Sequence, residues 1–250
     1  MNLLDNGAPA QVINENGKSP IVLVCEHASA HIPAVLDNLG LGQEDRTAHI
    51  AWDIGAEPMA RLMSAQLDAP LIVQRYSRLV YDCNRPPENP SAWPEKSETT
   101  KIPGNVGLNA AQKSDRVEQI YKPFHQAVSD FLDQRQRGDI EPVFVTIHSF
   151  TATYHGKFRE VELGVLHDED TRFADAMLEH APDDYVARRN DPYGPEDGVT
   201  HTLNLHGGAR SLKNVMLEVR NDLIASDAGQ VIWAKRLAEL LNKSLSLTEV

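Results

Sequence analysis

The stretch IVLVCEHASAHIP, residues 21–33, decides the fold class. Its first five residues form a continuous apolar run, which is typical of a strand buried on both faces of a parallel sheet. Glu26 and His27 follow this run directly. Since open α/β sheets place their ligands at the carboxyl ends of such strands, the segment indicates a core strand with a polar site at its end.

Four further runs rich in valine, isoleucine and leucine also predict buried strands. They cover residues 71–74, 143–147, 161–166 and 215–219. Between the first two strands, apolar residues of segment 50–67 recur at mostly three- and four-residue steps, which predicts a crossover helix after a long loop. The alternation predicts an α/β fold with three α/β/α layers and a central mixed, largely parallel sheet.

Two more helices are expected later in the chain. The first spans residues 114–137, with Ser114 as its N-cap, Gly138 after its end and a kink at Pro123. The second begins after Ser226, another residue suited to capping. The apolar residues of this final helix that should face the core are Val231, Ile232, Leu237, Leu240 and Leu241.

Composition limits the class of protein and its partners. The 250 residues carry a formal net charge of -12, which gives no broad basic surface for nucleic acid. The apolar runs are much shorter than the roughly 20 residues of a membrane span, so no membrane partner is expected. No oligomeric partner can be inferred. One domain over residues 1–250 is expected, with residues 1–18 as an extended N-terminal segment.

The ends and the cysteines give further expectations. Residues 1–19 lack the basic and apolar regions of a secretory signal, which makes a cytoplasmic location the default. Cys25 and Cys83 are too few for a disulfide framework and are expected to be buried thiols. Segment 85–107 contains five prolines and is expected to be a long surface loop, either a lid over a site or a solvated insertion.

Two histidines directly follow predicted strands. His27 follows the first strand and His148 the strand at 143–147. Imidazole nitrogens from separate strand ends, joined by a carboxylate, are a common way to bind zinc in an α/β enzyme. A histidine taken alone is more often a structural residue held by hydrogen bonds.

Two other short segments of the sequence carry charged residues that could take part in a site. Arg78, Asn84 and Arg85 offer donors suited to a substrate carboxylate, although a surface salt bridge with Asp82 is the alternative. Glu218 lies in the middle of a predicted strand. A buried carboxylate there requires a nearby metal or cation, or pairing with an arginine at the strand edge.

The order of these short polar segments along the chain resembles that of the N-formylglutamate amidohydrolase family. The core of this family is similar to that of zinc carboxypeptidases and acylamino-acid deacylases. The resemblance runs from Ile21 to the last helix and implies a phosphorylase/hydrolase-like fold with a zinc carboxypeptidase-like core. The residues that carry it are the EHAS-HIP stretch with His27, WDIGA with Asp53, YDCNR with Asn84 and Arg85, YKPFH with His125, TIHSF with His148, and LEVRND with Glu218.

The resemblance implies roles for these residues. His27 and His148 resemble zinc ligands, and Glu218 resembles the carboxylate that activates water. Asn84 and Arg85 resemble the pair that holds the substrate's carboxylate, and Arg78 is expected to assist them.

The second protein ligand departs from the carboxypeptidase pattern, because the residue three after His27 is Ala30 rather than glutamate. The resemblance favours Asp53 as this ligand, with Glu26 as the alternative; strand alternation argues against Glu26 unless the strand has already ended. His125 is expected to support the site from behind or to be structural. His201 and His206 fit a substrate loop or a plain turn.

The implied activity is metal-assisted hydrolysis of a linear amide, with one Zn²⁺ per chain. The small-molecule substrate would be an N-acylated amino acid, first of all N-formyl-L-glutamate, split into formate and L-glutamate in amino-acid metabolism. The alternatives are a related metallo-deacylase or carboxypeptidase with another acyl or peptide substrate, and a non-catalytic protein that binds acidic ligands.

Overall fold

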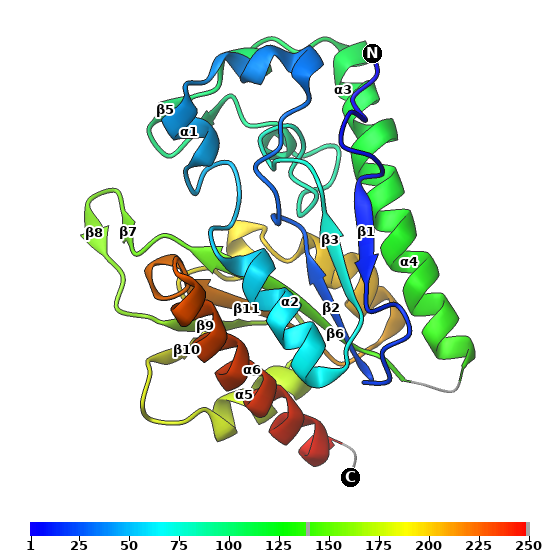
Figure 1. Ribbon diagram of the computed structural model, residues 1–250, viewed down its shortest axis with the longest axis vertical. Coiled ribbons are helices and arrows are strands. Elements are labelled where there is room, and N and C mark those ends of the chain that lie inside the picture. Colours follow the sequence, from blue (N-terminus) through cyan, green and yellow to red (C-terminus); the bar gives the residue numbers. More distant parts are fainter. Residues whose placement is uncertain (139–140, 249–250) are drawn as a thin grey trace.

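The computed structural model describes residues 1–138 and 141–248, and its centre is a seven-stranded sheet (Figure 1). The strand order is β1-β3-β2-β6-β11-β9-β10. The five strands predicted from apolar runs all belong to it. The strands are β1 (Ala10–Ile13), β2 (Ile21–Cys25), β3 (Leu71–Gln74), β6 (Val143–Phe150), β9 (Leu163–Leu166), β10 (Ala187–Arg189) and β11 (Asn214–Arg220).

The sheet is mixed but largely parallel. Strands β3, β2, β6 and β11 pair in parallel, whereas β1 pairs antiparallel with β3 and β9 pairs antiparallel with β11. At the other edge, β10 runs parallel to β9. The predicted sheet type is therefore confirmed. The two edge strands were not predicted, because they are short and part-exposed and lack a continuous apolar run.

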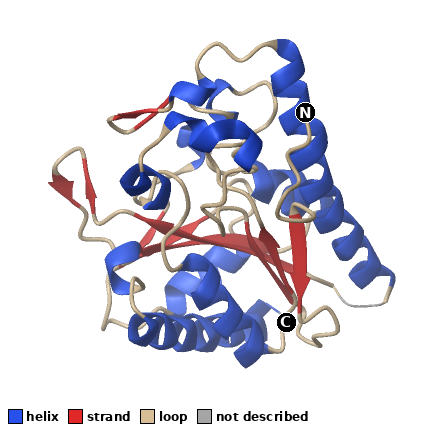
Figure 2. Ribbon diagram, turned by 45° about the horizontal axis from the view of Figure 1, so that its top comes forward, coloured by secondary structure: helices blue, strands red, loops and turns tan. Residues whose placement is uncertain are grey.

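Helices cover both faces of the sheet (Figure 2), which confirms the predicted α/β layering. One face packs against α2 (Ala56–Leu67), α5 (Arg172–His180) and α6 (Asp227–Thr248). The other face carries the long α3–α4 helical region and the loops above the sheet, with a core that includes Tyr81 and Phe124. The short helix α1 (Gln43–Thr47) lies in the loop that precedes α2.

The helix expected at 114–137 differs at its start. α3 (Ala110–Arg116) begins after Asn109, which forms a capping box with Gln112, so Ser114 is an interior residue and its prediction as N-cap is wrong. A π-helical turn, η4 (Val117–Tyr121), joins α3 to α4 (Lys122–Arg137). Pro123 follows this widened turn, where its ring no longer clashes with a carbonyl of a regular preceding turn.

The final helix begins as predicted, because the Ser226 hydroxyl accepts a hydrogen bond of 3.2 Å from the Gly229 amide. Its buried face contains Leu237, Leu240 and Leu241. Val231 and Ile232, in contrast, are 52% and 53% exposed, so their predicted inward orientation is wrong. The buried stripe of the first turns instead runs through Trp233 and Ala234, which follow the helical spacing of the later leucines.

Segment 85–107 is more ordered than a solvated loop. It contains two 3-10 turns, η2 (Pro90–Ala92) and η3 (Pro103–Asn105), and a hairpin of β4 (Lys96–Ser97) and β5 (Thr100–Lys101). Ala92 and Ile102 are fully buried, and the Asn105 amide donates to the carbonyls of Leu79 and Pro94. A second hairpin, β7 (Thr153–Tyr154) with β8 (Lys157–Phe158), projects from the sheet near it (Figure 1).

The two cysteines form no disulfide. Cys25 and Cys83 are both free and buried, as predicted. Within residues 1–138 and 141–248, no helix combines the length and the hydrophobicity needed to cross a membrane.

Candidate active site

Two histidines and one aspartate converge where β2 ends and β6 passes beside it. His148 Nδ1 lies 2.9 Å from Asp53 Oδ2, and His27 Nδ1 lies 3.3 Å from the same oxygen. The two Nδ1 atoms are 3.2 Å apart, and all three side chains are buried. Ligand atoms of these residues all lie within 4.8 Å of one another. Two imidazole nitrogens and one carboxylate oxygen are a donor set that could hold a divalent metal ion.

Local backbone structure brings Asp53 to the two histidines. The Asp53 amide donates to the His27 carbonyl at 2.9 Å, and the Ser149 amide donates to Asp53 Oδ2 at 3.2 Å. Gly55 then starts α2 with a φ of 80°, and any Cβ atom at this position would collide with the Ile224 carbonyl. The glycine of the WDIGA stretch is therefore required by a left-handed turn and a close backbone approach.

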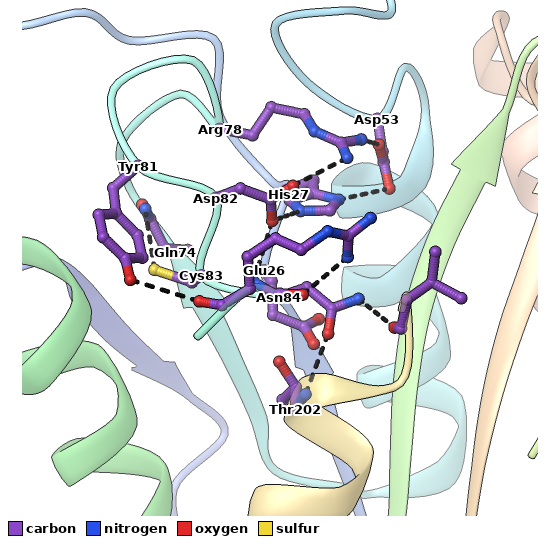
Figure 3. Close-up of polar contacts among 12 residues, drawn as sticks. Glu26, His27, Asp53, Gln74, Arg78, Tyr81, Asp82, Cys83, Asn84 and Thr202 are labelled. Atoms are coloured by element: carbon purple, nitrogen blue, oxygen red, sulfur yellow. Dashed lines mark hydrogen bonds and ion pairs between the residues drawn. The ribbon is translucent and has the colours of Figure 1, made fainter. Parts of the chain in front are cut away.

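Each imidazole also faces a second carboxylate on its opposite edge. His27 Nε2 lies 2.7 Å from Asp82 Oδ1, and His148 Nε2 lies 3.0 Å from Glu26 Oε2. Arg78 joins the network at 3.3 Å from Asp53 and 3.0 Å from Asp82 (Figure 3). The Nδ1 atoms of both rings thus point toward the same small volume, while the Nε2 atoms point away from it.

Charge decides the protonation of this network. Burial and Arg78 lower the pKa of His27, but Asp82 and Asp53 outweigh them and raise it. Burial also lowers the pKa of His148, yet Glu26 and Asp53 raise it well above its usual value. The ion pairs of this network join three buried carboxylates, those of Glu26, Asp53 and Asp82, with one arginine, Arg78. When both histidines are neutral, the charges of these four groups sum to -2. One divalent cation would balance them.

Glu218 stands beside the converging ligands. It is the register partner of His148 on the parallel neighbour β11, so both side chains lie on the same face of the sheet. Only 6% of Glu218 is exposed, and its Oε2 has no hydrogen-bond partner in the described part of the chain. Burial, with a further contribution from Asp53, raises the pKa of Glu218 to about 7. A carboxylate with this pKa can both accept and return a proton near neutral pH.

A pocket of about 220 Å³ opens over this site. The predicted residues that line it are His27, Asp53, Arg78, Asn84, Arg85, His148 and Glu218. The lining also includes Glu98, from the β4–β5 turn of segment 85–107, and the aromatic residues Tyr154 and Tyr193. The pocket is of a size for a small molecule rather than a long peptide.

The three residues expected to bind the substrate differ in how many hydrogen bonds and ion pairs their side chains already make within the protein. Asn84 uses both ends of its amide to hold the chain at 199–202, donating to the Val199 carbonyl at 2.5 Å and accepting from the Thr202 amide at 3.0 Å. Arg78 is tied to Asp53 and Asp82. The Arg85 side chain donates to the Asn84 carbonyl at 2.7 Å and still lines the pocket.

The remaining predicted residues lie behind the site. Glu26 follows the last residue of β2, so strand alternation does not apply to it, but it contacts the edge of His148 that faces away from Asp53. His125 does not line the pocket; its Nε2 donates to the Cys83 carbonyl at 2.8 Å, and its Nδ1 accepts from His206 Nε2 at 2.9 Å. His206 belongs to a π-helical turn, η6 (Leu203–Gly207), and His201 bonds the Tyr121 hydroxyl at 2.9 Å.

Sequence reasoning missed two features of the site. Asp82 was interpreted only as a salt-bridge partner, although a carboxylate close to a candidate carboxylate-binding pair was visible in YDCNR. His49 and Glu98, which form an ion pair of 3.1 Å at the pocket, have no strand-end or motif signal.

Comparison with known families gives an independent result. The sequence model of the N-formylglutamate amidohydrolase family matches residues 19–225. The chain belongs to the N-formylglutamate amidohydrolase family. The resemblance noted in the sequence is confirmed, and the protein is a hydrolase that acts on a linear amide of a small molecule.

Solved structures agree with this assignment. The crystal structure of an Agrobacterium tumefaciens gene product is 53% identical, with a TM-score of 0.96 over 98% of this chain and 97% of the other. An N-formylglutamate amidohydrolase from Ralstonia eutropha shares the fold at 18% identity, with a TM-score of 0.66 and 97% of each chain covered. None of the curated proteins matches the sequence significantly.

Proposed function

We propose that this amidohydrolase cleaves the amide of an N-acylated amino acid, with N-formyl-L-glutamate as its first substrate and formate and L-glutamate as products. One Zn²⁺ per chain would be held by His27, Asp53 and His148. The observation that carries the proposal is the convergence of two imidazole Nδ1 atoms and a carboxylate oxygen beside Glu218, at the floor of an open pocket.

The chain's own residues account for the proton transfers. When bound, zinc supplies Lewis acidity and brings the pKa of water to about 7. Glu218 takes a proton from the attacking water and later returns it to the leaving nitrogen, which its pKa of about 7 allows. Arg78 lines the pocket while Asp53 and Asp82 fix its guanidinium, so it is placed to stabilise the negative charge that develops on the formyl oxygen.

Substrate carboxylates need cations inside an otherwise acidic protein. Arg85 is the arginine of the pocket with no carboxylate partner among the ion pairs of the described residues, so it is the main group for this role. Asn84 supports it by fixing the chain at Val199, which also lines the pocket.

The test joins metal analysis to a formate-release assay. The purified protein is expected to contain one zinc per chain and to release formate from N-formyl-L-glutamate faster than it cleaves acetyl, succinyl or peptidyl substrates. Faster cleavage of one of those would move the proposal to another acylamino-acid hydrolase. A metal-free protein that binds acidic amino acids without cleaving any substrate would replace it with the binding-protein alternative.

A further inference from the structure

Glu26 is a charged residue that the proposed reaction does not use. It is fully buried and does not line the pocket. Among the ion pairs of the described residues its partner is His148, at 3.0 Å between Glu26 Oε2 and His148 Nε2. A buried charge of this kind is costly unless it acts on a specific partner.

The position of Glu26 excludes it as a ligand of an ion at the converging Nδ1 atoms. His148 Nδ1 faces Asp53 at 2.9 Å, whereas Glu26 contacts the opposite ring nitrogen. The imidazole ring therefore stands between Glu26 and the volume that would hold the ion. Figure 3 shows the Glu26 carboxylate directed toward Thr202 and Asn84, away from Asp53.

A carboxylate also faces the outer nitrogen of His27, where the contact is a hydrogen bond. His27 Nε2 contacts Asp82 at 2.7 Å, and its Nδ1 faces Asp53 at 3.3 Å. A neutral imidazole carries a proton on only one nitrogen. A carboxylate at Nε2 keeps the proton there and leaves the Nδ1 lone pair directed at the ion.

The surroundings of Glu26 strengthen its effect on His148. The buried side-chain atoms near this end of the sheet that have no hydrogen-bond partner in the described structure are both Glu26 oxygens, His148 Nε2, Thr146 Oγ1, Thr202 Oγ1 and His206 Nδ1. Thr146 lies two residues before His148 on the same face of β6. None of these groups carries a positive charge that could neutralise Glu26 in place of His148, and solvent does not screen it.

We propose that Glu26 is a positioning residue for the metal site: its buried carboxylate lies 3.0 Å from His148 Nε2 and, through its negative charge, strengthens the binding of a divalent cation at His148 Nδ1. This inference rests on the metal site of the proposed function and assigns Glu26 a place behind the ligand instead of on the ion.

The test compares the zinc affinity of variants by competition with a chromophoric chelator. Glu26→Gln keeps a hydrogen-bond acceptor of almost the same shape but removes the charge, and is expected to weaken zinc binding by about 10- to 100-fold. Asp5→Asn makes the matching substitution in a histidine–carboxylate pair outside the pocket, where Asp5 contacts His31 at 2.7 Å and is 38% exposed. This control should retain the wild-type affinity.

A second variant and a spectrum keep the test decisive if Glu26→Gln does not fold. Glu26→Asp keeps the charge one methylene farther from His148 and is expected to lie between wild type and Glu26→Gln in affinity. The visible spectrum of the Co²⁺-loaded protein should shift in the Glu26 variants and stay unchanged in Asp5→Asn. Wild-type affinity and spectrum in the Glu26 variants, or an equal loss in Asp5→Asn, would overturn the proposal.

These measurements separate the inference from the proposed function. If wild type binds zinc tightly but releases no formate, the substrate assignment fails and the role of Glu26 is unaffected. If His148→Ala leaves zinc affinity unchanged, the metal site itself is misplaced.

Discussion

Two pairs of buried histidines lie on the same side of the sheet and behave in opposite ways. The rings of His27 and His148 lie 4.9 Å apart, and those of His125 and His206 lie 5.1 Å apart. Three carboxylates surround the first pair. The second pair contacts Tyr121, Phe124 and Phe144 and a backbone carbonyl. Burial is therefore common to both pairs, and the partners differ.

The partners decide the charge of each pair. Carboxylates raise the pKa of His27 and His148, whereas burial lowers the pKa of His125 to about 4 and that of His206 to about 3. The Cys83 carbonyl can only accept, so the hydrogen bonds run from His206 to His125 and from His125 to Cys83. The carboxylates around the first pair favour a bound cation. The second pair is neutral, and its hydrogen bond to the Cys83 carbonyl fixes the turn that carries Asn84 and Arg85.

The largest expected effect follows from the carboxylate beside the first pair. Glu218→Gln should retain zinc and the fold but lower turnover by roughly 10²- to 10⁴-fold, because the proton acceptor is lost. Steady-state formate release and metal analysis measure the two quantities. Glu179→Gln, at an exposed position of α5, serves as the control. Unchanged turnover in Glu218→Gln would remove this residue from the mechanism.

The next largest effect is expected on substrate binding by Arg85, in the turn that the second histidine pair holds by a hydrogen bond. Arg85→Ala should raise KM by about 10- to 100-fold for substrates with free carboxylates, since a charge-assisted hydrogen bond is lost both before and during the reaction. Zinc affinity should stay the same. Kinetics with N-formylglutamate and with its esters test the assignment, which an equal loss for both kinds of substrate would contradict.

A third prediction uses pH to separate the pairs. The folded pKa of about 4 for His125 lies below the usual value of 6.5, so the unfolded chain binds more protons between these values. Stability from His125 is therefore present above pH 6.5 and is lost as pH falls toward 4, by up to about 3 kcal/mol. His27 and His148 have raised pKa values, and their contribution in metal-free protein has the opposite sign.

Urea unfolding of wild type and His125→Phe, in chelator at pH 7.5 and pH 5, measures this difference. The fall in unfolding free energy between the two pH values should be smaller in the variant, because the phenyl ring does not titrate. A fall as steep as in wild type would show that His125 is not the group that is protonated on unfolding.

The smallest effect is expected where a histidine–glutamate pair is part-exposed. Glu98→Gln removes the His49 ion pair, whose side chains are 34% and 19% exposed, and should change the free energy of unfolding by less than about 1 kcal/mol. The loss of thermal stability in this variant should be smaller than the loss in Glu26→Gln, because Glu26 is buried and Glu98 is part-exposed. A loss in Glu98→Gln as large as in Glu26→Gln would contradict it.

The sequence predicted what depends on pattern along the chain. Continuous apolar runs marked the five core strands, and polar residues after them marked His27 and His148. The edge strands β1 and β10 were missed, because pairing with a neighbour forms them and their own composition does not. The inward orientation of Val231 and Ile232 was wrong, because the side of α6 that meets the sheet is set by packing against α2 and α5.

The finer features of the site depend on contacts between distant segments. Nothing in the spacing of Glu26 and Asp82 shows that each faces the outer nitrogen of a histidine, since this requires the turn after β2 and the loop after β3 to meet beside β6. The π-turns that bring His125 and His206 together likewise have no local signature.

Zinc titration of chelator-stripped protein, followed by isothermal calorimetry, tests the contrast between the two pairs most directly. Wild type and His206→Phe are expected to bind one ion per chain with similar affinity, and His148→Ala is expected to lose this binding. Tight binding that survives in His148→Ala, or that disappears in His206→Phe while the protein stays folded, would contradict the account.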